Sequence, residues 1–520
     1  MGRISLLDYK VPDFFNQVDL LLERHIREER GGNVAIYYGD QGITYADLYL
    51  SVNRLGNSLK NLGIEPEDRI LIILNDSPEF ITAYLASMKI GAVPCPVNTL
   101  AQPKDYVFFA SDSRSKALFV NFEHYEKIRE IKKEVPSLKH VIIVGGSEKG
   151  TINYSELISK GSSELQVETT SKDDMAFWMY TSGTTGVPKG VIHLHHDICY
   201  YIPPFAELIL GITEKDVIFA TSKMFFSYGR NASLEIPLLY GASVILWPKW
   251  PRPEDIIELI ETKRPSIFFS VPTFYNAILK QVEKRGFCDF SSIRACVSAG
   301  EPLPKEIFEK WERRFSLEII DGVGSTDVGG IYMANKEGKR KPGSSGKIIQ
   351  GFEGELRGDD GLPVKQGSVG TLWIKNDGVT PGYWRRHDKN KEVIKGEWFN
   401  TGDLFLMDED GYFYYQGRAD DMLKVSGQWV SPLEVENALM EHPAVKECGV
   451  GGVPSEEGLI KIKAFVVLNE GYRPSDDLER EIIEHVKAKI AHFKVPKSIA
   501  FVEELPRTVT GKLVRYKLRN

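Results

Sequence analysis

The sequence predicts an α/β protein with a small antiparallel β unit and a C-terminal α+β domain, and three patterns along the chain carry this prediction. Short apolar runs of strand length recur as far as residue 320, with helical stretches between several of them. Strands that alternate with helices form parallel sheets, because each helix carries the chain back to the start of the next strand. Residues 341–416 are instead rich in glycine, and from residue 417 a charged turn precedes a compact α+β pattern.

The elements of the α/β part can be placed in order. Residues 43–62 predict an amphipathic helix, because their leucine and valine residues recur at helical spacing. Apolar runs predict strands at residues 70–74, 117–120, 141–144, 217–220, 244–247, 267–271 and 317–320.

The last third of the chain has a different pattern of predicted strands and helices. Alternating residues at 371–375 predict one strand of the antiparallel unit, which covers about residues 341–416. A strand pattern at 464–468 and a helical pattern at 477–490 belong to the α+β part. We place the domain boundary at 418–421, so that residues 1–417 and 418–520 form two domains.

Bulk properties exclude several classes of protein. A chain of 520 residues is too long for one ordinary domain. The net charge of −7 argues against binding of nucleic acid. Five cysteines without a C-x-x-C pair predict neither a disulfide framework nor a zinc site. No apolar run approaches the roughly 20 residues of a membrane helix, and no signal-peptide pattern is present, so we expect a cytoplasmic protein.

Residues 180–191 form the most informative segment of the chain. Three glycines, several hydroxyl residues and Lys189 gather in one short loop. Glycine lets backbone N–H groups approach an anion closely, and lysine adds positive charge. The spacing is not that of a Walker A loop. We therefore predict a loop that binds phosphate, in preference to a flexible turn between two strands.

This segment resembles the phosphate loop of the acyl-adenylate-forming superfamily, which contains acyl-CoA synthetases, adenylation domains of peptide synthetases and beetle luciferases. Further segments resemble motifs of the superfamily in its own order along the chain, at residues 84–98, 298–303, 321–327, 401–404, 417–427 and 506–512. The resemblance thus covers nearly the whole chain. It implies an N-terminal domain of two parallel-sheet α/β subdomains and a small β-barrel, followed by a mobile small α+β domain.

The chemistry that the resemblance implies explains these residue types. A carboxylate is a poor electrophile, so the superfamily first joins it to the α-phosphate of ATP, which gives acyl-AMP and pyrophosphate. In the CoA ligases the thiol of coenzyme A then displaces AMP. Two anions must meet in the first step, so the site needs cations and N–H donors in place beforehand. The implied partners are a small carboxylic acid, ATP and coenzyme A, with Mg²⁺ as the cofactor.

The resemblance assigns the nucleotide to residues of several motifs. The phosphates are expected at the loop residues Thr181, Ser182, Gly183, Thr184, Thr185, Gly186 and Lys189. Adenine is expected beside Gly300, Glu301 and Pro302, and the nucleotide also beside Asp321 and Gly322. The ribose is expected beside Asp403, with Arg418 at ribose or phosphate. Asp403 also has a simpler interpretation, as a residue of a turn.

Thr326 is expected at the α-phosphate and Asp327 at Mg²⁺. The superfamily usually has glutamate at the position of Asp327, so direct coordination by this shorter side chain is left open, and a helix N-cap is an alternative.

The resemblance places the remaining catalytic residues in the C-terminal domain. Lys512 is expected to bridge the carboxylate and the α-phosphate, although a solvated basic tail is the ordinary interpretation of its surroundings. Asp420 matches the hinge about which the superfamily rotates this domain between the two half-reactions. In the second arrangement the loop of Lys424, Ser426, Gly427 and Trp429 is expected to face the active site and line the CoA tunnel.

His193, His195 and His196 suggest a metal site at first sight. They lack nearby cysteine or Glu-x-x-His partners, so we do not predict one.

The acid pocket is expected at Phe226, Ser227 and Tyr228, together with Gly324, Gly330 and Ile331. Residues 225–229 resemble the aromatic motif of benzoate-CoA ligases, and Asp112 begins another string shared with that branch. An aromatic wall suits a flat apolar acid, although core packing is the alternative for these rings.

Two departures from the benzoate enzymes leave the acid open. Gly330 stands where those enzymes have histidine, which implies a roomier or differently shaped pocket. Arg230 replaces an apolar residue, and its partner is a polar substituent of the acid, a CoA phosphate or a surface carboxylate. Benzoate, a hydroxybenzoate, an alicyclic acid and a branched short-chain acid all remain candidates.

Three other functions use the same motifs: an adenylation enzyme that loads a carrier protein, a luciferase-like oxygenase and a non-catalytic nucleotide-binding protein. The assembly state is also open, and a homodimer is one of the alternatives.

Overall fold

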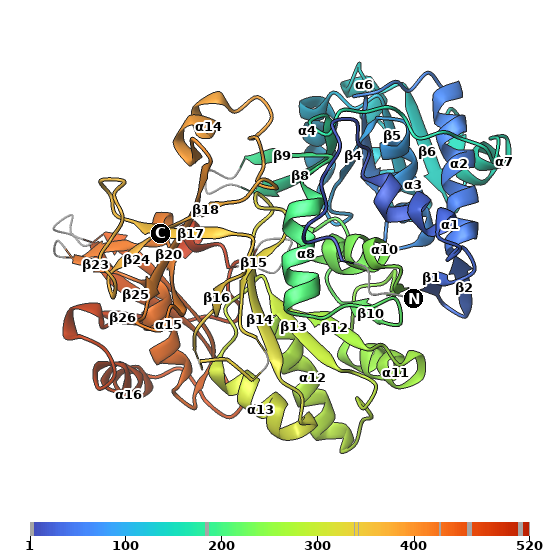
Figure 1. The fold of residues 1–520 in the computed structure, drawn as a ribbon. Helices are drawn as coiled ribbons and strands as arrows, with labels where there is room; N and C mark the ends of the chain where they lie inside the picture. The colour runs from blue at the N-terminus through green and yellow to red at the C-terminus, as the bar shows by residue number, and fades with distance from the viewer. Residues whose placement is uncertain are drawn as a thin grey trace. The chain divides into compact units, whose positions relative to one another are not determined.

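The structure is a computed structural model, and it describes residues 5–182, 187–336, 338–341, 343–425, 428–454, 460–507 and 513–518 (Figure 1). The chain divides into two compact units. One comprises Met1–Gly354 and Ile374–Phe399, and the other comprises Glu355–Trp373 and Asn400–Asn520. The domain boundary expected at residues 418–421 stays a prediction.

A nine-stranded sheet forms the centre of the first unit. Its order is β16-β15-β14-β13-β12-β10-β11-β1-β2. The strands β1, β11, β10, β12, β13 and β14 run parallel, and the edge strands β2, β15 and β16 are antiparallel. Their bounds are β1 (Val34–Tyr38), β2 (Gln41–Thr44), β10 (Val217–Ala220), β11 (Ser243–Leu246), β12 (Ile267–Ser270), β13 (Ala295–Ala299), β14 (Ile319–Gly324), β15 (Ile331–Ala334) and β16 (Lys347–Ile348).

Three helices pack on this sheet, and they build one of the hydrophobic cores (Figure 1). They are α11 (Pro253–Lys263), α12 (Pro272–Arg285) and α13 (Lys305–Phe315). Ile256, Tyr275 and Trp311, one from each helix, are buried with Phe219 and Phe268 of the sheet. The predicted strands at 217–220, 244–247, 267–271 and 317–320 are confirmed; the first matches β10 at both ends, and the ends of the others differ by up to four residues.

A second sheet in the same unit is fully parallel, with the order β4-β3-β5-β6-β7. Its strands are β3 (Arg69–Ile73), β4 (Val93–Pro96), β5 (Ala117–Asn121), β6 (His140–Val144) and β7 (Ile152–Asn153). The helices around it are α2 (Tyr45–Asn61), α3 (Pro78–Lys89), α4 (Pro103–Ser113), α5 (Phe122–Tyr125), α6 (Ile131–Glu134) and α7 (Tyr154–Ser159). The predicted amphipathic helix is α2, which begins where the Thr44 side chain and Asp47 form a capping box.

A hairpin and three short helices complete the parts of the first unit that matter for the site. The hairpin pairs β8 (Met175–Ser182) with β9 (Pro188–Leu194). The helices are α8 (Ile198–Leu208), α9 (Ser227–Arg230) and α10 (Ile236–Tyr240), with the π-helical turn η3 (Asn231–Glu235) between the last two.

The glycine-rich region holds a five-stranded sheet, as expected, with the order β17-β18-β20-β19 and β21 beside β20. Its strands are β17 (Glu353–Arg357), β18 (Val369–Lys375), β19 (Ile394–Lys395), β20 (Trp398–Met407) and β21 (Phe413–Arg418), and α14 (His387–Val393) precedes β19. The pairs of β20 with β19 and with β21 are antiparallel.

The C-terminal part is the predicted α+β structure. Three strands, β24 (Val445–Pro454), β25 (Ile460–Leu468) and β26 (Ser498–Phe501), form a sheet, and a short ribbon pairs β22 (Leu423–Val425) with β23 (Gln428–Val430). The helices α15 (Pro432–Met440) and α16 (Asp476–Lys487) share a core with the three-stranded sheet, in which Leu439, Ala464 and Ile482 are buried. The predicted helix at 477–490 is therefore correct, although it ends at Lys487.

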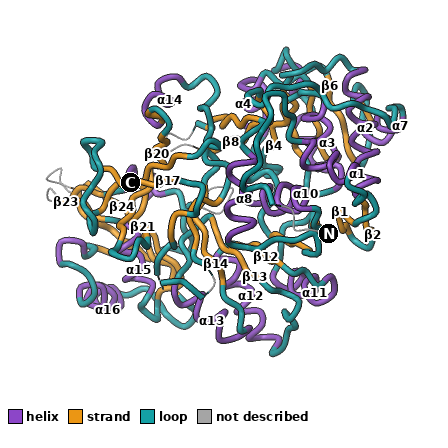
Figure 2. Tube along the Cα trace, viewed as in Figure 1, coloured by secondary structure: helices purple, strands orange, loops and turns teal. Residues whose placement is uncertain are grey.

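Figure 2 shows how strands and helices alternate along the first unit. None of the helices in the described part of the chain combines the length and the apolar character that a bilayer crossing requires.

Candidate active site

The predicted phosphate loop lies at the tip of the β8–β9 hairpin. Strand register pairs Thr181 with Lys189 and Ser182 with Pro188, so the glycine-rich residues connect the two strands. The Lys189 ammonium lies 4.1 Å from the centre of the Tyr383 ring, within the range of a cation–π contact. Gly183, Thr184, Thr185 and Gly186 lie outside the described residues, so their part in phosphate binding stays a prediction.

Asp112 anchors this hairpin to residues 383–386. Its carboxylate accepts hydrogen bonds from Tyr180 of β8 at 3.0 Å and from Arg386 at 3.3 Å, and its carbonyl accepts one from the Trp384 indole at 3.0 Å. The sequence analysis gave Asp112 no role, because its partners lie far away along the chain.

The predicted adenine residues come together at one edge of the nine-stranded sheet. Ser298 and Ala299 of β13 lie opposite Asp321 and Gly322 of β14, and both strands are parallel. Gly300 follows β13 directly, and its φ of +88° favours glycine. The carboxyl ends of parallel strands are where α/β sheets bind ligands. The neighbourhood of the two motifs, which the resemblance implied, is thus present in the structure.

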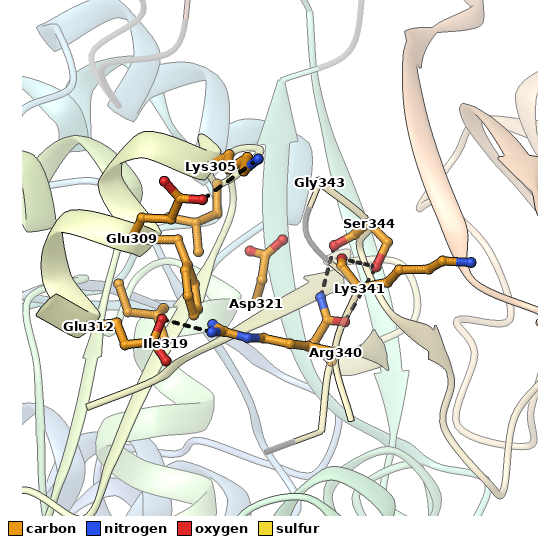
Figure 3. A pocket seen from close by; sticks show the side chains of 12 residues that line it. Lys305, Glu309, Glu312, Ile319, Asp321, Arg340, Lys341, Gly343 and Ser344 are labelled. Atoms are coloured by element: carbon orange, nitrogen blue, oxygen red, sulfur yellow. Dashed lines mark hydrogen bonds and ion pairs between the residues drawn. The ribbon is translucent and has the colours of Figure 1, made fainter. Parts of the chain in front are cut away.

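A cavity of about 120 Å³ adjoins this edge, and it is lined by Leu303 and Asp321 from the two motifs (Figure 3). Figure 3 shows the Asp321 carboxyl directed between α13 and the segment that carries Arg340 and Ser344. Burial raises the pKa of the Asp321 carboxyl well above its usual range. A carboxyl in this state can donate a hydrogen bond as well as accept one, which suits an edge that reads a nucleobase.

Thr326 and Asp327 lie in a turn between β14 and β15, and hydrogen bonds hold the backbone of this turn. The Thr326 carbonyl lies 2.8 Å from His193 Nε2, and the Asp327 carbonyl accepts from the Thr380 N–H at 2.8 Å. Asn231 donates to the Gly329 carbonyl at 3.1 Å. The alternative of Asp327 as a helix N-cap is wrong, because the turn leads into the strand β15.

The Asp327 side chain fits the predicted contact with Mg²⁺. Its Oδ1 atom is buried and has no hydrogen-bond partner among the residues that the structure describes. Buried polar atoms normally have partners, and carboxylate oxygen is a preferred ligand of Mg²⁺.

Two histidines of the H-x-H-H cluster, His193 and His196, contact the two oxygens of Asp197, whereas His195 has other partners. His193 is fully buried, stacks on Phe177 at 4.8 Å and lies 2.9 Å from Asp197 Oδ2. His195 accepts from a backbone N–H through Nδ1, and His196 contacts the Lys172 carbonyl at 2.9 Å. Burial lowers the pKa of His193 to about 4 and that of His195 to about 3.

The acid-pocket motif lies at the start of α9. Phe225 is buried with its ring against Phe226, whereas Phe226, Ser227 and Tyr228 remain partly exposed. The Tyr228 hydroxyl donates to the carbonyl of Ser270, at the end of β12, and to that of Val297, in the middle of β13. Core packing therefore applies to Phe225, and the next three residues have the partial exposure of a pocket wall.

Tyr201 of α8 fills the space beside Gly329 and Gly330. A Cβ atom on Gly329 would lie 2.6 Å from Tyr201 Cδ1, and one on Gly330 would lie 3.1 Å from Cδ2. Tyr201 therefore leaves little space at these two glycines, and the expectation of a roomier or differently shaped acid pocket at Gly330 stays a prediction. Ile331, which begins β15, is buried, and Gly324 ends β14.

Arg230 has a carboxylate partner, but a buried one. Its guanidinium carbon lies 3.8 Å from the centre of the Phe177 ring, and Nε lies 3.4 Å from Glu235 Oε1. Both charged side chains are almost fully buried. The expected surface carboxylate is thus wrong as the partner. The sequence contains one signal for this partner, because Glu235 is a charged residue within the otherwise mostly apolar run 232–240.

In the second unit, Asp403 and Arg418 form a cross-strand pair between β20 and β21. Arg418 Nη1 donates to Asp403 Oδ1 at 3.2 Å and to the Thr401 carbonyl at 2.9 Å, and the Tyr415 hydroxyl lies 3.4 Å from the same carboxylate oxygen. Asp403 lies inside a ten-residue strand, so the alternative of a turn residue is wrong.

The structure describes only some of the other residues that are expected to act in the C-terminal part. Asp420 lies in the short helix η4 (Ala419–Asp421) directly after β21. The backbones of Lys424 and Trp429 pair across the β22–β23 ribbon. Ser426, Gly427 and Lys512 lie outside the described residues.

Comparison with known families identifies the chain. The model of the family described as "AMP-binding enzyme" matches residues 22–384, and that of the "AMP-binding enzyme C-terminal domain" matches residues 434–512. The chain belongs to the AMP-binding enzyme family. It is an AMP-forming acid–CoA ligase, and enzymes of this kind use ATP, Mg²⁺ and coenzyme A.

Relatives of the ligase act on aromatic acids, according to their names. It is 39% identical over 516 residues to "Benzoate--CoA ligase" of Thauera aromatica, which covers 98% of this chain and 97% of that one. It is 36% identical to "4-hydroxybenzoate--CoA/benzoate--CoA ligase" of Rhodopseudomonas palustris, with 98% and 94% covered.

Two similar solved structures are also CoA ligases that are named for aromatic acids. An anthranilate CoA ligase, AuaEII, in complex with anthranoyl-AMP has a TM-score of 0.92 at 36% identity, with 99% of this chain and 98% of that chain covered. A benzoate CoA ligase from Burkholderia xenovorans LB400 has a TM-score of 0.89 at 36% identity, with 97% and 100% covered. The ligase thus belongs to the benzoate-CoA ligase branch of the superfamily.

Proposed function

We propose that the ligase acts on benzoate or a closely related aromatic acid. The observation that carries the proposal is the partly exposed wall of Phe226, Ser227 and Tyr228. Tyr228 is bonded to the carbonyl of Val297, in the same strand that leads to the predicted adenine residues. A flat ring against this wall lies near the nucleotide, as the first half-reaction requires. The names of relatives with 39% and 36% identity support an aromatic acid.

In the first half-reaction, a carboxylate oxygen of the acid attacks the α-phosphorus of ATP, and the bond to pyrophosphate breaks. Thr326 would contact the α-phosphate and Lys189 the outer phosphates, which places donors and positive charge where negative charge accumulates. The Asp327 oxygen that lacks a partner would hold Mg²⁺, which neutralises phosphate charge when bound. Asp403 would accept hydrogen bonds from the ribose hydroxyls.

In the second half-reaction, the thiol of coenzyme A attacks the acyl carbonyl and AMP leaves. The proposal follows the superfamily in using the segment after residue 418 as a mobile domain, with Asp420 at its hinge. Lys512 would act in the first arrangement, and the loop of Lys424, Ser426, Gly427 and Trp429 in the second. If the two arrangements alternate in this way, a substitution of Lys512 should impair only the first half-reaction, and a substitution in the loop only the second.

An acid panel tests the substrate. Acid-dependent release of pyrophosphate is measured with benzoate, hydroxybenzoates, anthranilate, cyclohexane carboxylate and branched short-chain acids, with and without coenzyme A. We expect the highest kcat/KM with a benzoate-like acid, and sustained turnover only with coenzyme A. A preference for an alicyclic or branched acid would keep the chemistry and refute the aromatic pocket. Release that requires a carrier protein would refute CoA ligation.

Lys512→Ala tests the division between the half-reactions. We expect acid-dependent exchange of pyrophosphate into ATP to fall at least about 100-fold, because the variant lacks a cation at developing charge. Thioester formation from supplied acyl-AMP should change little. Lys517→Ala is the matched control, because Lys517 is exposed in the same basic tail. Equal loss of both half-reactions in Lys512→Ala, or an equal effect of the control, would contradict the assignment.

A further inference from the structure

Two buried carboxylates stand behind the turn of Thr326 and Asp327, and neither belongs to the motifs that predict the reaction. Asp197 is 0% exposed and Glu235 is 1% exposed. Each reaches a carbonyl of the turn through one intermediate side chain, His193 for Asp197 and Asn231 for Glu235. Burial of a carboxylate is costly unless it makes hydrogen bonds. We call each chain of hydrogen bonds, from the buried carboxylate through the intermediate side chain to the carbonyl, an arm.

The first arm runs from Asp197 through His193 to the Thr326 carbonyl. Nε2 of His193 faces that carbonyl at 2.8 Å, so this nitrogen carries the proton and donates. Nδ1 accepts from the Asp197 carboxyl, whose Oδ2 lies 2.9 Å away, because burial keeps the ring neutral and raises the pKa of that carboxyl well above its usual range. The Leu194 N–H donates to the same oxygen at 3.0 Å. The ring of His193 stacks on Phe177, which fixes its plane.

The second arm runs from Glu235 through Asn231 to the Gly329 carbonyl. The amide nitrogen of Asn231 has two N–H groups, and it donates to Glu235 Oε2 at 2.5 Å and to the carbonyl at 3.1 Å. Tyr201 donates to Glu235 Oε1 at 2.8 Å, and its ring packs against Gly329. Arg230 balances the charge of Glu235.

The two arms and the Thr380 N–H together hold the carbonyls of Thr326, Asp327 and Gly329. The side chains of Thr326 and Asp327 project from backbone that is fixed on both sides. Adenylation depends on such placement, because a displacement of about 1 Å at a reacting centre can cost about 100-fold in rate.

We propose that His193 and Asn231 are positioning residues, which hold Thr326 and Asp327 in place for formation of the acyl-adenylate. The proposal rests on the proposed function. The two arms also adjoin different parts of the site. His193 lies in β9, a strand of the hairpin that carries the phosphate loop. Asn231 comes directly after α9, which begins at the acid-pocket wall. Loss of the His193 arm should therefore affect the nucleotide, and loss of the Asn231 arm should affect both nucleotide and acid.

The test compares half-reactions in His193→Phe and Asn231→Ala. Phenylalanine keeps an aromatic ring against Phe177 and removes both hydrogen bonds of the arm. With the acid that gives the fastest wild-type reaction, we expect pyrophosphate exchange to fall about 10- to 100-fold in each variant. Thioester formation from supplied acyl-AMP should stay within about 2-fold of wild type. The KM for the acid should rise in Asn231→Ala and stay unchanged in His193→Phe.

Two further variants separate positioning from general stability. His193→Gln returns a donor near the position of Nε2 and should recover part of the exchange rate. His195→Asn removes another fully buried histidine whose ring bonds to the Gln17 N–H and not to the turn, so it should leave exchange unchanged. Calorimetry of MgATP binding gives a readout without turnover, and we expect weaker binding in His193→Phe and in Asn231→Ala but not in His195→Asn.

Three results would overturn the proposal: equal loss of both half-reactions in the folded variants, wild-type exchange in His193→Phe and Asn231→Ala, or an equal loss of exchange in His195→Asn. If His193→Phe does not fold, Asn231→Ala decides on the same criteria. Failure of the proposed function looks different, because the wild-type protein would then prefer an alicyclic or branched acid or show no acid-dependent exchange at all.

Discussion

At the scale of the residue, Asp403 shows how a motif and a local structure combine. A Gly-Asp pair alone is compatible with an ordinary turn, but the strand β20 holds Asp403 opposite Arg418. Gly402 has a φ of +71°, and a Cβ atom there would lie 2.8 Å from Arg418 Nη2. The backbone therefore favours glycine before the aspartate, and a side chain there would displace the Arg418 guanidinium.

Asp403→Ala tests the ribose contact. We expect the KM for ATP to rise about 10- to 100-fold, because hydrogen bonds to a charged acceptor contribute about 1.5–3 kcal/mol. The KM for the acid should change little. Steady-state kinetics with varied ATP measures the effect, and Asp410→Ala, at an exposed position beyond the same strand, is the control. An unchanged KM for ATP would show that Asp403 has only a structural role.

Tyr201 is a buried residue that packs beside Gly329 and Gly330, at the expected acid pocket. Tyr201→Ala should shift the preference between acids by about 10-fold towards those with a bulkier ring substituent, since the ring fills the space beside two glycines. Ratios of kcat/KM across the acid panel give the result. Tyr201→Phe keeps the ring and should keep the preference, and a preference that is the same in all three proteins would place Tyr201 outside the pocket wall.

At the scale of the element, the sequence predicts what depends on local pattern. The strands β3, β5, β6, β10, β11 and β12 coincide with apolar runs, and α2 with an amphipathic repeat. The phosphate loop is evident because one short segment holds most of its donors. The contacts of the turn at Thr326 are different. His193 is 133 residues away from it in sequence, and Asn231 is 98 residues away from Gly329. No local pattern encodes such pairs, so only the fold reveals them.

The same limit applies at the acid pocket. Gly330 alone does not reveal that Tyr201 from α8 packs beside it. Arg230 alone leaves three kinds of partner open, and only the fold shows that the π-helical turn η3 brings Glu235 within 3.4 Å of its Nε atom. Both contacts join side chains that meet only after the helices have packed.

At the scale of the whole molecule, buried histidines link stability to pH. His25 and His195 are 0% exposed, and each accepts a hydrogen bond through Nδ1, from Arg30 and from the Gln17 N–H respectively. Burial lowers the pKa of both to about 3, below the 6.5 of a histidine in an unfolded chain. Protonation therefore favours the unfolded state. The stability that the neutral rings contribute is complete above pH 6.5 and is lost as the pH falls towards 3.

We expect each ring to lower the free energy of unfolding by up to about 1.4 kcal/mol per pH unit below 6.5. Denaturant unfolding at pH 7.5, 6.5 and 5.5 measures the slope. His195→Asn keeps an acceptor for Gln17 and should reduce the slope by the share of one ring, whereas His387→Asn, at an exposed position of α14, should not. A stability that is constant from pH 7.5 to 5.5 would contradict the linkage.

As a whole, the molecule is proposed to join an aromatic acid to coenzyme A through an acyl-adenylate. The most direct measurement incubates the protein with ATP, Mg²⁺, coenzyme A and benzoate, and quantifies all products. We expect AMP, pyrophosphate and benzoyl-CoA in equal amounts, and benzoyl-AMP when coenzyme A is left out. Formation of ADP, release of AMP without a thioester, or no reaction with any aromatic acid would contradict it.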